Sequence, residues 1–321
     1  MSIVLDSITY TYGQGTPFEK TALHDVSLTI EEGEFVGIIG HTGSGKSTFV
    51  QHLNGLLHPT SGQVTVNGVD LVGKTEEAKK MRHQVGMVFQ YPEHQLFEET
   101  IAQDIAFGPR NLGLSESEID ERVREAMAFV GLEYDTYADR SPFHLSGGQM
   151  RRVAIAGVVA LRPSYLVLDE PSAGLDPFGR EEIFSQIMRL HQEQGVTVIL
   201  VSHNMEDVSR MASRVLVFDK GTVVLDGKPL DIFNHHRETL QAAGVDIPPV
   251  SLMLASLRER GLAVSEDCLS VDDAVDAILA VPCIEERCHS KADRSQTVSS
   301  KARHQSSSAG GSTHEREEGG V

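Results

Sequence analysis

A glycine-rich stretch lies between an apolar run at residues 34–39 and a helical pattern, and its residue types suit phosphate binding. It matches the pattern GxxxxGK followed by Ser or Thr, and it consists of Gly40, His41, Thr42, Gly43, Ser44, Gly45, Lys46, Ser47 and Thr48. Glycines let backbone N–H groups converge on phosphate oxygens, and the amino terminus of the helix adds partial positive charge. Lys46 would contact the β and γ phosphates, and the Ser47 hydroxyl would hold Mg²⁺. The stretch predicts a P-loop.

Two adjacent carboxylates end a second apolar run, at residues 165–168. They are Asp169 and Glu170, and a buried strand rarely ends in paired acids unless a cation or a reacting water needs them. Asp169 would orient the Mg²⁺ shell, and Glu170 would polarise the attacking water as a general base. Taken alone, the pair could also be solvated at a turn or cap a helix.

A third motif, Leu145-Ser146-Gly147-Gly148-Gln149, precedes a helical pattern at residues 150–160. Its Ser and Gly residues would expose N–H groups at the amino terminus of a helix, which makes a second phosphate cradle. The alternative is a plain helix cap with glycines for a tight turn. The pentapeptide resembles the signature sequence of ABC-type ATPases. Two phosphate-binding helix ends in one chain suggest that one of them serves a nucleotide held by a partner.

The elements that position these motifs alternate between short β-branched runs and longer helical patterns. This alternation predicts an α/β protein with a largely parallel sheet. Apolar residues three and four apart predict amphipathic helices at residues 118–130 and 178–194. The candidate strands cover residues 35–39, 84–89, 165–168, 196–201 and 215–219.

The resemblance to ABC-type ATPases covers residues 1–230, and four further elements follow in the order of that family. Tyr12 occupies the place of an aromatic that stacks on adenine. Gln90 matches the glutamine that senses Mg²⁺ and the γ-phosphate, so it joins Ser47 and Asp169 as a metal-site residue. His203 resembles the switch histidine, and residues 172–176 resemble the loop that crosses the dimer interface.

The resemblance implies a fold and a mechanism. The fold is an ABC-type nucleotide-binding domain with a RecA-like parallel core sheet, an antiparallel β edge, a helical signature subdomain and a small C-terminal helical extension. The cofactors are ATP and Mg²⁺, with two ATP molecules between the subunits of a head-to-tail dimer. Gln90, Glu170 and His203 would act on the ATP held by this chain's own P-loop. The partner's site would be completed by Ser146, Gly147, Gly148 and Gln149.

A narrower resemblance follows Gln90. Residues 91–100 and 104–109 resemble the energy-coupling factor (ECF) branch of ABC importers, and residues 94–96 and 171–177 are similar to the second of its two ATPases. The implied partners are a second, paralogous ATPase, a transmembrane coupling protein and a small membrane protein that captures a vitamin or metal ion. The implied location is the cytoplasmic face of the cell membrane, as a peripheral protein.

The chain is expected to contain three parts. Residues 1–228 would form the ATPase domain, with its helical subdomain at about residues 91–160, and residues 229–285 would form the helical extension. Residues 286–321 are rich in Ser, Gly, His and charge, which predicts a disordered tail. A zinc site at Cys283, Cys288, His289 and His304 is disfavoured, because the spacing of the two cysteines lacks the tight pattern of zinc ligands.

Composition limits the possible partners. The net charge of −18 would repel a phosphate backbone unless a basic patch were segregated on one face, so nucleic acid is not expected. The longest unbroken apolar run, residues 153–161, is too short to span a bilayer. Asp6 interrupts the amino-terminal segment where a signal peptide would be apolar. The three cysteines fall in the last quarter, so no disulfide framework is expected for the main fold.

The alternatives to an energy-coupling factor subunit are the ATPase subunit of another ABC importer, a soluble ABC ATPase without a transport role, and a nucleotide-binding switch. A soluble ABC ATPase acting on the ribosome would carry two cassettes in one chain, and one acting on DNA would carry a long coiled coil between P-loop and signature. Residues 40–145 leave no room for either insertion. A nucleotide-binding switch without turnover is disfavoured because both Glu170 and His203 are present.

Overall fold

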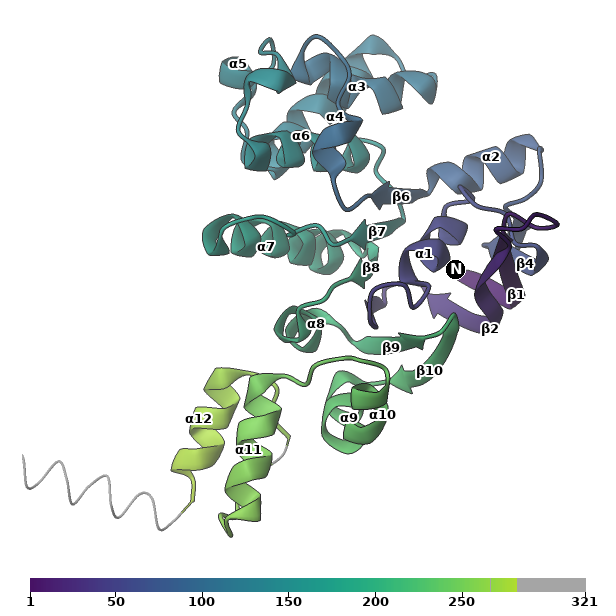
Figure 1. Ribbon diagram of the computed structural model, residues 1–321. Helices are drawn as coiled ribbons and strands as arrows, with labels where there is room; N and C mark the ends of the chain where they lie inside the picture. Colours follow the sequence, from purple (N-terminus) through teal and green to yellow (C-terminus); the bar gives the residue numbers. More distant parts are fainter. Residues whose placement is uncertain (266, 282–321) are drawn as a thin grey trace, which may run out of the picture. The chain divides into compact units, whose positions relative to one another are not determined.

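The computed structural model describes residues 1–265 and 267–281 (Figure 1). These residues divide into two compact units, Met1–Pro249 and a second unit that begins at Val250. The predicted disordered tail at residues 286–321, together with the disfavoured zinc ligands, lies outside the described residues. The same holds for the last four residues of the predicted extension. Both predictions therefore remain expectations from the sequence.

The core of the first unit is a six-stranded sheet with the order β10-β9-β3-β8-β7-β6. All neighbours are parallel except β9 and β10, which are antiparallel. Every residue of β3, β6, β7 and β8 is buried, so these strands read as continuous apolar runs. The strands are β3 (Phe35–Ile39), β6 (Val85–Val88), β7 (Tyr165–Asp169), β8 (Thr197–Val201), β9 (Arg214–Asp219) and β10 (Thr222–Gly227).

The parallel register aligns the ends of the central strands. Ile38 of β3 pairs with Val201 of β8, Val201 pairs with Asp169 of β7, and Leu168 pairs with Val88 of β6. The loops that follow these strands therefore begin at one edge of the sheet. Strand positions predicted from the sequence agree with the structure to within one or two residues.

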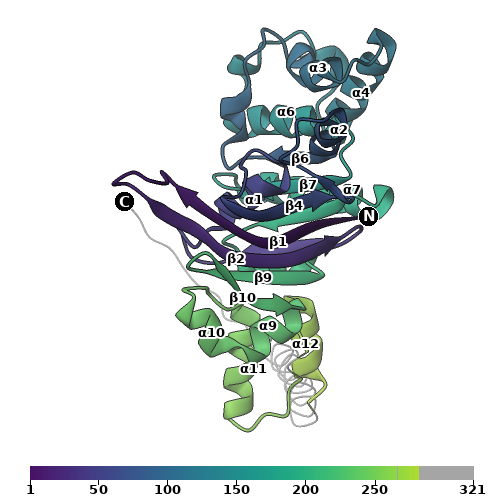
Figure 2. The ribbon, with the colours of Figure 1, turned by 90° about the vertical axis from the view of Figure 1, so that its right-hand side faces the viewer.

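A second, antiparallel sheet has the order β2-β1-β4-β5. Figure 2 shows the long strands β1 and β2 running side by side. Ile3 and Ile30 of this sheet, Val36 and Ile38 of the parallel sheet, and Phe49 of α1 (Lys46–Leu53) belong to one buried apolar cluster. The two sheets and α1 thus share a core. The strands are β1 (Ser2–Tyr12), β2 (Lys20–Glu31), β4 (Ser61–Val66) and β5 (Val69–Asp70).

Helices gather between β6 and β7 in the sequence and form a separate layer in Figure 1. The segment begins with the 3₁₀ turn η1 (Pro92–Gln95) and includes a second one, η2 (Pro142–His144). Its helices are α3 (Ile101–Asn111), α4 (Glu116–Phe129), α5 (Tyr134–Tyr137) and α6 (Gly147–Val159). The predicted α/β fold with a parallel core sheet, an antiparallel β edge and a helical subdomain is confirmed.

The remaining helices of the first unit pack around the sheets. They are α2 (Glu76–His83), α7 (Pro177–Gln194), α8 (Met205–Met211), α9 (Pro229–His235) and α10 (Arg237–Ala242). The packing division falls at residue 249, so α9 and α10 belong to the first unit. The functional boundary expected at residue 228 stays a prediction.

The second unit contains α11 (Pro249–Glu259) and α12 (Val271–Leu279). It has a small core of its own that includes Leu254, Val264, Cys268 and Ala274. The described part of the extension expected at residues 229–285 is helical, but α9 and α10 lie in the first unit and only α11 and α12 in the second, so its bounds stay a prediction. Across residues 1–265 and 267–281, no helix combines the length and the apolar character needed to cross a membrane.

Replacing Gly37 by Ala tests the contact between β3 and α8. A Cβ on Gly37 would lie 2.6 Å from Cγ1 of Val208 and 3.2 Å from Cβ of Ala212, and a β-branched side chain cannot easily move aside. We expect Gly37→Ala to lower the free energy of unfolding by about 1–3 kcal/mol. Gly157→Ala on α6 is the control, since its Cβ would meet nothing within 4 Å. Urea titration measures both, and equal midpoints for the two variants would contradict the proposed overpacking.

Candidate active site

The P-loop connects the buried strand β3 to helix α1. Two of its glycines leave no room for a side chain. A Cβ on Gly40 would lie 2.4 Å from the carbonyl oxygen of Phe218, and one on Gly45, where φ is +110°, would lie 2.8 Å from that of Ala22. The loop is therefore pressed against two neighbouring strands, and only glycine permits this approach.

Lys46 is buried beneath the loop and is 5% exposed. Its Nζ donates to the carbonyl oxygens of Gly40 and His41, at 2.7 and 3.0 Å. Burial lowers the pKa of Lys46, although the charges of Glu170 and Asp169 raise it. The Ser44 hydroxyl is buried and has no hydrogen-bond partner among the described residues. A buried cation, an unsatisfied hydroxyl and a glycine cradle at a helix amino terminus fit a phosphate group.

His41 anchors the first half of the P-loop. Its Nδ1 lies 2.8 Å from the carbonyl oxygen of Thr42, and its Nε2 lies 3.1 Å from Oδ1 of Asp219 at the end of β9. No sequence pattern indicates a role for Asp219, because nothing in its own neighbourhood relates it to the P-loop. His41 thus braces the loop against the sheet.

Tyr12 is the last residue of β1, is 42% exposed, and lines a pocket together with residues of the P-loop. Its hydroxyl lies 3.1 Å from Oγ1 of Thr48 in the P-loop. The ring of Tyr10 meets the Tyr12 ring edge-on, with centroids 4.8 Å apart. These two contacts fix the orientation of an exposed aromatic face beside the P-loop, as stacking on a base requires.

Most of the residues predicted to bind or hydrolyse ATP at this chain's own P-loop line one pocket of about 500 Å³. This volume lies within the range of small-molecule and cofactor sites, which is about 300–1,000 Å³. Tyr12, Gln90, Glu170 and His203 line it, as do P-loop residues from Thr42 to Thr48 other than the buried Ser44. Sequence reasoning missed the further wall residues Lys20, Thr21, Ala22, His24, Lys220 and Gly221.

The predicted catalytic residues meet at the carboxylate of Glu170. Nε2 of Gln90 donates to Oε2 at 3.3 Å, and Nε2 of His203 lies 2.8 Å from Oε1. Glu170 has a positive φ of 52°, and its N–H donates to the carbonyl oxygen of Val201 at 3.0 Å. A non-glycine residue rarely adopts this conformation, and such strain is concentrated at functional sites. The structure therefore holds both carboxylate oxygens in defined positions.

Asp169, the last residue of β7, is 6% exposed. Burial raises its pKa, while a hydrogen bond from the Ser47 hydroxyl lowers it. Mg²⁺ prefers oxygen ligands and is usually held by one or two protein groups together with phosphate oxygens and water. The neighbouring oxygens of Ser47 and Asp169, beside the P-loop, suit such an ion, and Gln90 lines the same pocket.

The signature residues lie elsewhere. Ser146 caps α6, with its hydroxyl accepting from the N–H of Gln149 while the Gln149 side chain accepts from the N–H of Ser146. Gly147 and Gly148 form the first turn of the helix. With Gly174 to Asp176, most of these residues line a separate pocket of about 400 Å³. The structure does not bring them to the P-loop pocket of the same chain.

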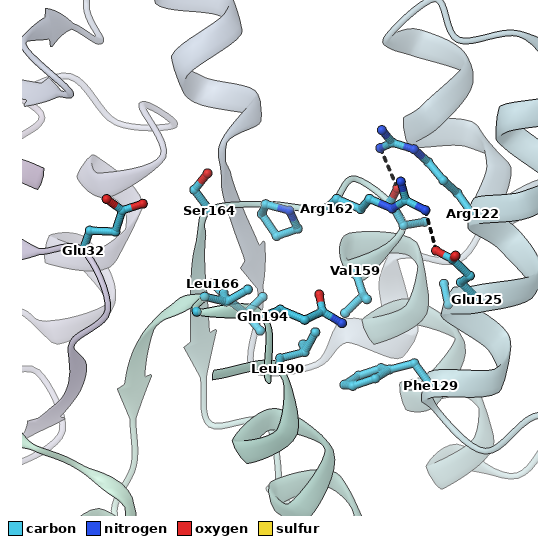
Figure 3. A pocket seen from close by; sticks show the side chains of 15 residues that line it. Glu32, Arg122, Glu125, Phe129, Val159, Arg162, Ser164, Leu166, Leu190 and Gln194 are labelled. Atoms are coloured by element: carbon cyan, nitrogen blue, oxygen red, sulfur yellow. Dashed lines mark hydrogen bonds and ion pairs between the residues drawn. The ribbon is translucent and has the colours of Figure 1, made fainter. Parts of the chain in front are cut away.

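A further pocket of about 290 Å³ opens at the amino ends of β7 and β8, the opposite ends from the P-loop (Figure 3). Its two guanidinium groups are already bound, since Arg162 pairs with Glu125 at 2.5 Å and Arg122 donates to the carbonyl oxygen of Ala160 at 3.1 Å. The remaining wall is largely apolar, with Phe129 among its residues. Paired arginines and an apolar wall do not suit a triphosphate.

The family model described as "ABC transporter" matches residues 23–173, which contain the P-loop, the signature and the acidic pair. A protein of Clostridium perfringens named energy-coupling factor transporter ATP-binding protein EcfA2 is 54% identical over 281 residues, which are 88% of this chain and 98% of the relative. This chain belongs to the energy-coupling factor transporter ATP-binding proteins. A relative of the same name from Clostridioides difficile is 52% identical, with coverage of 88% and 98%.

Solved structures resemble this energy-coupling factor ATPase over most of its length. The cbiO1 protein from Clostridium perfringens, described as part of the ABC transporter complex cbiONQ, is 35% identical with a TM-score of 0.65, covering 80% of this chain and 97% of that one. The cassette MJ0796, solved as a dimer bound to ADP and Pi after hydrolysis, is 32% identical with a TM-score of 0.64, covering 71% and 98%. The energy-coupling factor protein described here is an ATPase, and the predicted family and enzyme class are confirmed.

Asp169→Asn tests the cost of burying this carboxyl. A carboxyl whose folded pKa is raised binds its proton more tightly in the folded state, so the free energy of unfolding falls as pH rises between the unfolded and folded pKa values. Asn removes this cost and still accepts the Ser47 hydrogen bond. At pH 7, without nucleotide or Mg²⁺, we expect the variant to be more stable by about 1 kcal/mol. The gain should shrink as the pH approaches the ordinary aspartate pKa of about 4.

Urea titration at several pH values measures this effect, and Asp6→Asn, at an exposed position on β1, is the control that should change little. A loss of stability in Asp169→Asn at pH 7 would show that its charge is a net stabiliser of the nucleotide-free protein.

Proposed function

We propose that this ATPase drives the uptake of a vitamin or metal ion through separate membrane subunits, as a peripheral protein on the cytoplasmic face of the cell membrane. The observation that carries the catalytic part is the Glu170 carboxylate, held by Gln90 and His203 beside the P-loop. The transport part is supported by relatives named as energy-coupling factor transporter proteins and by the cbiO1 neighbour from a transporter complex.

The P-loop would bind the triphosphate of ATP. Its backbone N–H groups and the Lys46 ammonium would bind the phosphate oxygens, and the exposed ring of Tyr12 would stack on the base. Ser47 and Asp169, with Gln90 nearby, would hold Mg²⁺, which would neutralise charge on the phosphates. Lys46 already lies beneath the loop, where its Nζ donates to the carbonyl oxygen of Gly40, so its ammonium is close to the proposed phosphate site.

Glu170 would accept the proton of the attacking water. Gln90 donates to one carboxylate oxygen and Nε2 of His203 lies 2.8 Å from the other, so both contacts restrain its orientation without filling all of its lone pairs. The backbone of Glu170 has a positive φ of 52°, and this conformation sets the direction in which the Glu170 side chain leaves the strand. Such positioning of a general base is the part of catalysis that these residues supply.

A second ATPase subunit, which we propose to be a paralogue, would complete the reaction unit. Ser146, Gly147, Gly148 and Gln149 would face the nucleotide on that partner. Three of them, Ser146, Gly148 and Gln149, line a pocket separate from this chain's P-loop, which supports the proposal. The other proposed partners are a transmembrane coupling protein and a small membrane protein that captures the substrate.

Glu170→Gln tests the general base. The amide has nearly the same shape but cannot accept the proton, so we expect kcat to fall by about 10²–10⁴-fold while MgATP binding is retained. Glu181→Gln on α7 is a matched control, since Glu181 is exposed and pairs with Arg210. The measurement is ATP hydrolysis together with equilibrium nucleotide binding. Hydrolysis at the unchanged rate in Glu170→Gln would refute the role of this residue.

Purification of the tagged protein from membranes in mild detergent tests the transport proposal. We expect a second ABC ATPase, a coupling protein with several membrane spans and small membrane proteins, identified by mass spectrometry. A two-protein permease with a binding protein would assign the chain to another kind of importer. A complex without any membrane protein would overturn the proposal of transport.

A further inference from the structure

Arg151 is the charged residue of the signature helix that lies deepest in the protein. It is 3% exposed and follows Gln149 by two positions on α6. Its Nε and Nη2 donate to the carboxylate of Glu93 in η1, at 3.3 to 3.4 Å. Nη2 also donates to the carbonyl oxygen of Gln90 at 3.2 Å, and Nη1 donates to that of Ala173. One guanidinium therefore contacts three residues from two segments of the chain, one that follows β6 and one that follows β7.

Two of these contacts lead directly to Glu170. Gln90, whose carbonyl oxygen binds Arg151, uses its side chain to bind the Glu170 carboxylate. Ala173, whose carbonyl oxygen also binds Arg151, donates its N–H to the carbonyl oxygen of Glu170 at 3.2 Å. Arg151 thus holds the residue that orients the Glu170 side chain and the residue that holds the Glu170 backbone.

The chemistry of the side chain explains why arginine is needed here. A guanidinium carries five N–H donors in a rigid plane, so it can hold a carboxylate and two carbonyl oxygens in one fixed arrangement. Lysine would keep the charge but would replace this plane with a single flexible ammonium. A charge at this depth also needs its partners, and the Glu93 side chain, itself 19% exposed, provides the opposite charge.

We propose that Arg151 is a positioning residue for ATP hydrolysis, which aligns Glu170 with the signature helix by holding Gln90 and Ala173. The inference rests on the proposed role of Glu170. It makes the geometry of this chain's general base depend on the position of α6, whose amino terminus is the proposed binding surface for the partner's nucleotide. Occupancy of the partner's site and alignment of this site are then linked by one buried side chain.

Arg151→Lys is the main test, made in the full-length protein with its partner subunits. A small displacement of a catalytic group can cost about 10²-fold in rate, so we expect kcat to fall by about 10- to 100-fold. The KM for ATP should change by less than about twofold, because none of the P-loop contacts involves Arg151. A merely structural role would instead lower the thermal stability and leave kcat of the folded fraction unchanged.

Arg214→Lys is the matched control. Arg214 is less deeply buried than Arg151, but like it binds a carbonyl oxygen and carboxylates, in its case Thr29, Glu34 and Asp226. It contacts none of the residues proposed to bind or hydrolyse ATP. We expect a comparable loss of thermal stability with an unchanged kcat. Equal effects of the two substitutions on kcat would overturn the positioning role of Arg151.

Two further variants distinguish an error in the role proposed for Glu170 from an error in the role proposed for Arg151. Glu93→Gln keeps an acceptor for Arg151 but removes the charge, so it should lower kcat less than Arg151→Lys does, and it serves if Arg151→Lys does not fold. In the Glu170→Gln background, Arg151→Lys should cause no additional loss, because the group it positions is gone. Full activity in Glu170→Gln would refute the proposed general base. A low rate in Glu170→Gln with a normal kcat in Arg151→Lys would refute only the positioning role.

Discussion

Hydrogen bonding between parallel strands sets where the loops of the site begin. Ile38, Val88, Asp169 and Val201 are tied by the pairing of β3 with β8, β8 with β7, and β7 with β6. The residues one or two positions further along are Gly40, Gln90, Glu170 and His203. A shift of one strand by one residue would turn its side chains to the other face of the sheet and separate this group. Complete burial of these strands makes such a shift costly, since every residue of them would have to repack.

Burial disfavours the charged forms of two side chains in the site. Lys46 and Asp169 are each less than 10% exposed, and burial disfavours the charged form of both, lowering the pKa of the first and raising that of the second. Each partly compensates the other. A phosphate beside Lys46 and a cation beside Asp169 would remove the remaining cost, so ligand binding restores interactions that folding alone leaves incomplete.

Much of this arrangement could be predicted from the sequence, for a physical reason. The strands of the parallel sheet are buried on both faces, so they appear in the sequence as short apolar runs. Polar or glycine residues such as Gly40, Gln90 and Glu170 follow these runs and stand out against them. The antiparallel strands show a weaker pattern of alternating apolar and polar residues. Their pairing shifts register between Leu5 and Ile8, and positive φ values occur at Ser7 and Asp25, so the alternation that marks such strands is broken.

Other parts of the site have no local signature at all. Arg151 looks like an ordinary helix residue, since its acceptors come from segments 22 to 61 positions away. Asp219, the partner of His41, lies 178 positions from it. Such contacts depend on tertiary packing, and a pattern of spacing within one segment cannot reveal them. The roles assigned to the individual site residues likewise remain predictions that the proposed variants address.

The hydroxyl of Tyr12 is engaged by Thr48, which leaves mainly the face of the ring for a nucleobase. Stacking on an aromatic face depends on π-surface and is tolerant of which base is present, because every base has such a face. This platform by itself therefore does not distinguish adenine from guanine. Selectivity among nucleoside triphosphates has to come from side chains that reach the edge of the base, and Lys20 and His24 in the same pocket wall carry suitable polar groups. If Tyr12 stacks on the base as proposed, this protein would recognise ATP chiefly through its phosphates.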